Sequence, residues 1–179
     1  MRGIKRSVAT LAVLLLGVGV VAAQAQPQFS GAYTLDRSQS QFPQHERRSQ
    51  PDPQAQPGQP AQRPDIKLVV QQQGATLKVT RIIAMGTRER SETNTYVADG
   101  TDQTRRGYRG ETVTRAAFDG DRLVLTRTHT KKTDAGDRTM SRQSVWTLSP
   151  DGRTLTIDTT MQGAHGDRVM KTVYVRDLS

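Results

Sequence analysis

The sequence predicts an all-β protein, an antiparallel up-and-down meander of about eight or nine strands that closes into a barrel. Short segments rich in Val, Thr, Leu and Ile alternate with turn signals, and their side chains alternate with a period of two. No window beyond residue 25 keeps a helical period. A meander closes most economically into a barrel, because closure removes unpaired sheet edges. A β-sandwich is the alternative, because periodicity does not determine strand order.

Glycine-containing turns separate the expected strands, which are 29–36, 66–73, 76–83, 92–98, 112–118, 122–130, 138–148, 154–161 and 168–176. Asp-Gly occurs at 99–100, 119–120 and 151–152. Gly takes positive φ without a Cβ clash and Asp caps the turn locally, so these dipeptides favour hairpins. The alternation is clear after the last of them, where Leu155 and Ile157 alternate with Thr154 and Thr156.

The first 25 residues are typical of a secretory signal peptide, which forms a helix before it is removed. Arg2, Lys5 and Arg6 precede a 13-residue apolar run at 11–23, and 23–25 read AQA, a small-x-small cleavage pattern. An uncleaved membrane anchor is the alternative, but a spanning helix needs about 20 residues. We therefore expect a periplasmic or secreted protein that starts at Gln26 and has no integral membrane span after cleavage.

Residues 43–65 differ in composition from the rest of the chain. They hold six of the eight prolines and six glutamines, with almost nothing apolar. Proline removes backbone donors and fixes φ, so this stretch suits neither a helix nor a central strand. We expect a disordered Pro/Gln-rich loop here. The predicted organisation is then a signal peptide at 1–25, the first barrel strand within 26–42, this loop at 43–65, and the remainder of the barrel domain at 66–179.

Composition limits the chemistry. The chain has no cysteine, which excludes disulfides, thiolate metal sites and a cysteine nucleophile. Its formal charge is +9, and removal of the three basic residues in 1–25 lowers the charge to +6. A basic surface favours anionic partners such as lipid head groups or polyanionic glycans. A basic but merely solvated surface is the alternative.

Three motifs carry a resemblance. Residues 31–36 read GAYTLD, followed by Ser40 and Phe42; 118–125 read FDGDRLVL; and 146–157 read WTLSPDGRTLTI. Together they resemble small secreted lipocalin-like β-barrel proteins, a largely uncharacterised bacterial group related to the calycins. The resemblance implies a lipocalin-like barrel and structural roles for Gly31, Tyr33, Trp146 and Arg176. In it, Gly31 and Tyr33 lie at the closed end of the barrel, and Arg176 is the late arginine that packs on the early aromatic residue.

No constellation indicates catalysis or a bound metal. His45, His129 and His165 lie far apart in sequence, whereas a metal site needs several converging ligands. A Gly-x-Ser-x-Gly elbow is missing, and carboxylates concentrate in turns, where capping explains them. Glu92, Glu111 and Asp158 remain open as candidates for a carboxylate pair facing one cavity. The prediction is a protein that is not an enzyme, with no catalytic residues, no metal and no cofactor.

The candidate ligand-binding residues are Arg105, Arg106, Tyr108 and Arg109 in the densest basic stretch. Arginine forks suit phosphate or carboxylate, and a tyrosine between them offers a stacking face. Arg88, Arg90, Lys131 and Lys132 would extend this patch. A solvated Arg/Gly loop is the alternative, and the low aromatic content argues against nucleic acid as a partner.

Two functional hypotheses follow. In the first, the barrel binds a small apolar or amphipathic, lipid-like ligand whose anionic end meets basic residues near the mouth. In the second, the barrel is filled and the chain is a structural or interaction protein of the cell envelope that binds an anionic envelope component. The ligand's identity, the presence of a cavity and the oligomeric state stay open at this level.

Overall fold

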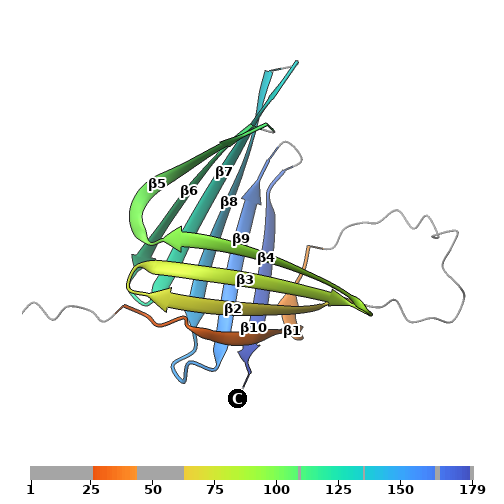
Figure 1. Ribbon diagram of the computed structural model, residues 1–179, viewed down its shortest axis with the longest axis vertical. Coiled ribbons are helices and arrows are strands. Elements are labelled where there is room, and N and C mark those ends of the chain that lie inside the picture. The colour runs from red at the N-terminus through yellow and green to blue at the C-terminus, as the bar shows by residue number, and fades with distance from the viewer. Residues whose placement is uncertain (1–25, 44–62, 109, 135, 164–165, 178–179) are drawn as a thin grey trace, which may run out of the picture.

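The computed structural model describes residues 26–43, 63–108, 110–134, 136–163 and 166–177. The predicted signal peptide and residues 44–62 of the predicted Pro/Gln-rich loop lie outside these ranges. Ten strands make up the described part (Figure 1): β1 Gly31–Gln41, β2 Asp65–Gln73, β3 Thr76–Met85, β4 Arg88–Val97, β5 Asp99–Gly107, β6 Gly110–Asp119, β7 Arg122–Thr133, β8 Gly136–Leu148, β9 Thr154–Gln162 and β10 Arg168–Arg176.

All ten strands belong to one antiparallel sheet in the order β4-β3-β2-β1-β10-β9-β8-β7-β6-β5. Chain neighbours pair as hairpins, and β1 pairs with β10 to bring the two halves of the chain together. The sheet curves until β2, β3 and β4 run across β6 to β9 (Figure 1). The all-β barrel prediction is confirmed and the sandwich alternative is wrong, because one continuous sheet forms a nearly closed barrel.

The expected strand count of eight or nine is too low by one or two, and the strand that was missed is β5. Its sequence, DGTDQTRRG, holds no large aliphatic residue, so it lacks the pattern that marks the other strands. Cross-strand partners on β6 hold it: Arg115 Nε lies 2.8 Å from Asp102 Oδ1, and Arg106 Nε lies 2.6 Å from Glu111 Oε2. β5 is an edge strand, as is β4, and Ala98 joins the two.

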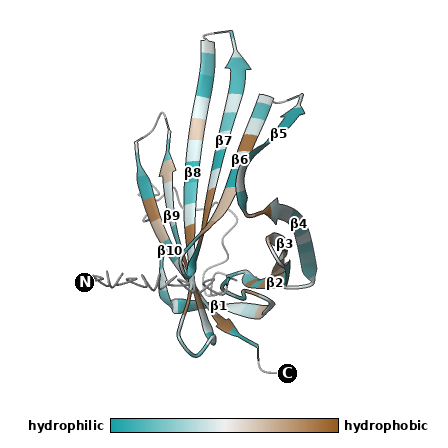
Figure 2. Cartoon of the chain, turned by 90° about the vertical axis from the view of Figure 1, so that its left-hand side faces the viewer, coloured by the Kyte–Doolittle hydropathy of each residue, from teal (hydrophilic) through white to brown (hydrophobic). Residues whose placement is uncertain are grey.

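The apolar core lies at one end of the barrel. This closed end carries the turns of the β2–β3, β6–β7 and β8–β9 hairpins, and its fully buried residues include Phe29, Tyr33, Leu77, Leu123 and Leu155. The segment before β1 crosses it: Phe29 N donates to Gln72 Oε1 on β2 (2.9 Å), and the Phe29 ring packs edge-on against Trp146 of β8, with centroids 6.2 Å apart. The opposite end, with the β5–β6 and β7–β8 hairpins, is hydrophilic (Figure 2).

The sheet register places the inward-facing residues of β7, β8 and β9 in rows. Leu123, Trp146 and Ile157 form the first row that spans all three strands at the closed end, and Leu125, Ser144 and Thr159 form the next. Arg127, Arg142 and Met161 form the third. The interior therefore changes from apolar to hydroxylated to cationic along the barrel axis. Within the described ranges no helix has the length and hydropathy of a membrane span.

Candidate functional site

A cavity of about 420 Å³ lies inside the barrel, above the apolar core. Eight strands contribute to its wall, namely β1 to β4 and β7 to β10. Its apolar residues are Leu35, Phe42, Ile66, Leu68, Val79, Leu125, Trp146, Ile157, Met161 and Met170. The volume falls within the range of small-molecule sites, which hold a ligand on a mostly apolar wall with a few polar groups.

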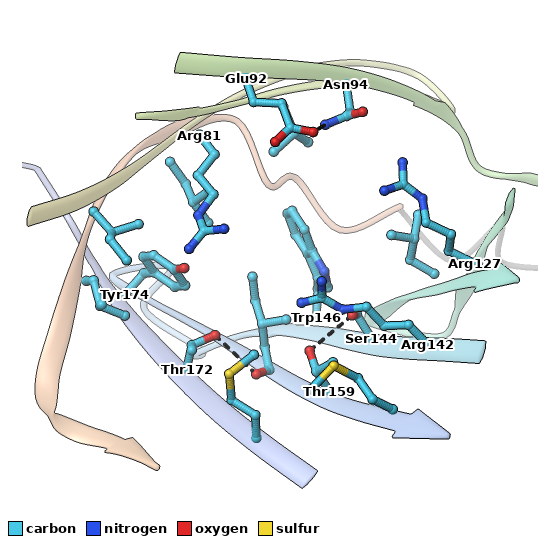
Figure 3. A pocket seen from close by; sticks show the side chains of 18 of the residues that line it. Arg81, Glu92, Asn94, Arg127, Arg142, Ser144, Trp146, Thr159, Thr172 and Tyr174 are labelled. Atoms are coloured by element: carbon cyan, nitrogen blue, oxygen red, sulfur yellow. Dashed lines mark hydrogen bonds between the residues drawn. The ribbon is translucent and has the colours of Figure 1, made fainter. Parts of the chain in front are cut away.

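Three arginines enter this cavity from different strands (Figure 3): Arg81 from β3, Arg127 from β7 and Arg142 from β8. Arg127 and Arg142 are cross-strand partners, which places their side chains next to each other on the same face of the sheet. None of the four ion pairs in the described part of the chain involves these arginines. Arg127 Nε is buried and has no hydrogen-bond partner. The site therefore contains unused cationic donors.

The arginines also affect one another's electrostatics. Partial loss of solvent lowers the pKa of Arg142, and the positive charge of Arg81 lowers it further, with a smaller effect in the same direction from Arg127. Arg142 is nevertheless still solvent-accessible, since the cavity is open. Arginine stays protonated in proteins, so the lowered pKa expresses the cost of desolvating Arg142 together with its repulsion by Arg81 and Arg127. An anion placed among the three side chains would relieve this repulsion.

Two tyrosines in the wall keep their protons. Burial raises the pKa of Tyr96 on β4 and of Tyr174 on β10, although the nearby charges of Arg127 and Arg81, respectively, act in the opposite direction. Both hydroxyls are therefore available as hydrogen-bond donors at neutral pH. Tyr174 lies on the same side of the cavity as Arg81 in Figure 3.

A single carboxylate, that of Glu92 on β4, is present among the lining residues. Glu92 is the cross-strand partner of Arg81, and its Oε1 accepts a hydrogen bond from Asn94 Nδ2 at 3.2 Å. Below the arginines, a buried hydroxyl pair joins Ser144 Oγ and Thr159 Oγ1 at 3.0 Å. The wall thus combines a cationic region, a pair of buried hydroxyl groups and an apolar region.

The predicted ligand-binding residues lie elsewhere, at the β5–β6 hairpin on the hydrophilic end. Arg106 and Tyr108 line a separate open groove of about 650 Å³ together with Lys131 and Lys132. Arg105 is the cross-strand partner of Thr112, so it is not on the same face of β5 as Arg106. Arg109 lies outside the described residues. Arg88 and Arg90 are on β4 and do not line this groove.

The predicted structural residues come together at the closed end. Arg176 Nη2 donates to Tyr33 Oη at 2.8 Å, and the Arg176 guanidinium lies over the Tyr33 ring at 5.1 Å. A Cβ on Gly31 would lie 3.2 Å from Arg176 Cζ, which explains the small residue there. Tyr33 Oη donates to the Phe29 carbonyl oxygen, and Phe29 packs on Trp146.

The open question of a carboxylate pair is resolved by the fold. Glu92 lines the cavity, Glu111 lines the hairpin groove, and Asp158 is exposed between the buried Ile157 and Thr159. These three groups do not share a cavity. Of the histidines, His129 is described, and its Nδ1 lies 3.0 Å from Thr112 Oγ1. The described residues contain no cluster of three metal-ligating side chains.

Sequence reasoning missed the three cavity arginines, although a signal for them exists. Arg81 continues the inward phase of Leu77 and Val79, and Arg127 continues that of Leu123 and Leu125. A charged residue in the apolar phase of a strand is placed inside a barrel by the period of two. The local density of basic residues led to the prediction of a site at the β5–β6 hairpin. That density does not indicate which face of a strand a side chain takes.

No protein-family model matches this sequence, and no curated protein matches it. Solved structures do match the fold. The zebrafish ileal bile acid-binding protein complexed with cholic acid aligns with 83% of this chain and 98% of its own at a TM-score of 0.50 and 15% identity. Secretory abundant heat soluble protein 4 from Ramazzottius varieornatus aligns with 84% of this chain and 95% of its own at a TM-score of 0.50 and 12% identity. At these identities the likeness is one of fold, that of a lipocalin-like barrel.

Proposed function

We propose that this chain is an exported, non-enzymatic binding protein that holds a small amphipathic anion inside its barrel. The observation that carries the proposal is the convergence of Arg81, Arg127 and Arg142 in a cavity whose remaining wall is largely apolar. The arginines would bind the acidic group, and the apolar wall would hold the rest of the molecule.

The free energies support this division of the site. Burial of apolar ligand surface contributes roughly 25 cal/mol per Å². A hydrogen bond to a charged group contributes about 1.5–3 kcal/mol. The zebrafish protein of the same fold is complexed with cholic acid, itself an acid, so this fold can enclose such a molecule. In this proposal the anionic end lies deep in the barrel, at the arginines, and not at the hairpin that the sequence pointed to.

Native mass spectrometry of the protein recovered gently from an exporting bacterial host tests the proposal. We expect the mass of a chain processed after Ala25, with an additional mass that disappears on denaturation. An Arg127→Gln/Arg142→Gln variant should lose the additional mass. Arg115→Gln is the matched control, because this arginine lies on the outer face of β6 and pairs with Asp102. An apo mass together with no binding of any long-chain acid would contradict the carrier function, and an unprocessed chain would contradict export.

The hairpin groove favours a second candidate function, contact with an anionic component of the envelope. Arg106, Lys131 and Lys132 line the groove with the fully exposed Tyr108 on two neighbouring hairpins, and they outnumber its two carboxylates, Glu111 and Asp137. Basic groups with an exposed tyrosine suit an anionic lipid surface, since tyrosine prefers the head-group region. Arg106→Gln/Lys131→Gln/Lys132→Gln should abolish sedimentation with vesicles that contain an anionic lipid. Equal sedimentation of the variant would rule this candidate out.

A further inference from the structure

The positive charges that line the cavity outnumber the negative ones. Three guanidiniums and one carboxylate line it, which leaves an excess of two positive charges. Glu92 is the register partner of Arg81 on the β3–β4 side. Arg127 and Arg142 face the cavity from the β7–β8 side, where no carboxylate lines the wall (Figure 3). A singly charged ligand would leave one positive charge uncompensated.

The number of hydrogen-bond donors in the cavity also favours a doubly charged ligand. Each guanidinium presents five N–H donors and no acceptor, and Arg127 Nε is buried without any partner among the described residues. The hydroxyls of Tyr96 and Tyr174 add two donors to the same wall. A carboxylate supplies two oxygens and one charge. A phosphate monoester supplies three terminal oxygens and, above its second pKa of about 6, a charge near two.

We propose that the cavity selects a dianionic head group, that of a phosphate monoester of an apolar alcohol, over a carboxylate of equal chain length. This inference rests on the proposed carrier function, because the apolar wall must first hold the chain. The phosphate would lie between Arg127 and Arg142, with Arg81 opposite, and would match the excess charge of the cavity. Bidentate contacts between arginine and phosphate oxygens fit this arrangement.

The test must separate the effect of the ligand's charge from the effect of protonation changes in the protein. The charged and titratable groups that line the cavity are Arg81, Glu92, Tyr96, Arg127, Arg142 and Tyr174. His129 lies one row above Arg127 on the same face of β7. Any change in these groups acts on every ligand at a given pH. A comparison of ligands at each pH therefore isolates the charge of the head group.

Calorimetric titration of the processed protein with decyl phosphate, decyl sulfate and decanoate provides this comparison. The sulfate has the tetrahedral shape of the phosphate but carries one charge throughout. At about pH 8 we expect decyl phosphate to bind at least about tenfold more tightly than either other ligand, as for one added charged hydrogen bond. Near pH 5 the phosphate is singly charged, and its advantage over the sulfate should disappear.

Each other outcome overturns a defined part of the argument. Equal affinities of the three ligands at the higher pH overturn the dianion preference and leave the carrier function standing. Equal binding of phosphate and sulfate, both tighter than decanoate, also overturns it, because shape then decides. Failure of all three ligands to bind overturns the carrier function as well.

Three variants separate a specific loss of binding from a loss of fold. Arg127→Gln should bring the ratio of phosphate to sulfate affinity close to one, whereas Arg115→Gln on the outer face should not change it. Glu92→Gln raises the excess charge to three and should tighten phosphate binding by several-fold. Damage to the fold would not tighten binding, so unchanged or weaker phosphate binding in a folded Glu92→Gln protein would overturn the proposal.

Discussion

At the closed end of the barrel, the fully buried Tyr33 side chain has both of its polar partners within the protein. Its Oη donates to the Phe29 carbonyl oxygen at 2.9 Å and accepts from Arg176 Nη2 at 2.8 Å. Arg176 Nε also donates to the Gly152 carbonyl oxygen at 2.9 Å. One side chain on the last strand thus connects the first strand to the β8–β9 turn.

Replacing Tyr33 with Phe should therefore destabilise the fold. The change leaves the Phe29 carbonyl oxygen and one Arg176 N–H without this partner, and an unsatisfied buried group costs about 1–3 kcal/mol. The free energy of unfolding in urea measures the effect. Tyr108→Phe, at a fully exposed position, should leave that free energy unchanged. Equal stability of the two variants would show that the hydroxyl of Tyr33 is not needed.

The cavity tyrosines predict a loss of stability at alkaline pH. Burial raises the pKa of Tyr96 and of Tyr174 above the ordinary tyrosine value of about 10. The unfolded chain then loses these protons at a lower pH than the folded chain does. Stability should be fully present below about pH 10 and should fall as pH rises from there through the raised values, because the unfolded state binds fewer protons in that window.

Unfolding in urea over a series of alkaline pH values measures this decline. The double variant Tyr96→Phe/Tyr174→Phe should show a shallower decline than the unmodified chain, because two of the groups that cause it are gone. The burial of Tyr33 also raises its pKa, so some decline should remain. Identical pH profiles for the two proteins would count against ionisation of the cavity tyrosines as the cause.

At the scale of single strands, β6 depends on a glycine at its first position. A Cβ on Gly110 would lie 2.1 Å from the Thr130 carbonyl oxygen of β7, and the φ of Gly110 is +123°. Both the contact and the backbone conformation exclude a side chain. Gly120, in the β6–β7 turn, also has a positive φ, of +61°, but no atom lies within 4 Å of its Cβ position.

A comparison of Gly110→Ala with Gly120→Ala therefore separates the stability cost of a steric collision from that of backbone strain. Gly120→Ala should cost about 1–2 kcal/mol of stability, the penalty of a left-handed conformation. Gly110→Ala should cost more, because β6 must also move away from β7 at Thr130. The midpoint and slope of urea unfolding give both values. A Gly110→Ala protein as stable as Gly120→Ala would mean that the hairpin shifts freely.

β5 shows how far the sequence predicts individual elements. Each of the nine expected strands contains large apolar or aromatic residues, and each has a counterpart in the structure. β5 contains no such residue, because it lies at the edge of the sheet and covers no core. Its pairing depends on β6 and on partners such as Asp102 and Arg115, which a local pattern does not reveal.

In the whole molecule, the barrel has a seam between its two edge strands, β4 and β5, which do not pair with each other. β4 pairs with β3 alone and β5 pairs with β6 alone, so each edge strand has one side without a ladder. Most residues of both strands are exposed, in contrast to β9 and β10. Edge strands with few buried contacts open first in local unfolding.

Hydrogen exchange followed by mass spectrometry should show this seam. We expect peptides from β4 and β5 to exchange fastest and peptides from β1, β9 and β10 to exchange slowest. Bound ligand should slow exchange in β4, since Glu92, Asn94 and Tyr96 line the cavity, and should affect β5, which does not line it, far less. Uniform protection of all ten strands would indicate that the seam is closed in solution.

The sequence by itself determined the class of the fold, the positions of most strands and their turns, because alternation and Asp-Gly turns act over a few residues. It also marked Gly31, Tyr33 and Arg176 through a resemblance. Only the tertiary structure decided that β1 pairs with β10, that the seam lies between β4 and β5, and that Arg81, Arg127 and Arg142 share one cavity. The physical reason is that a strand's period states which face a side chain takes, whereas the sheet's curvature and register decide which other strands it meets.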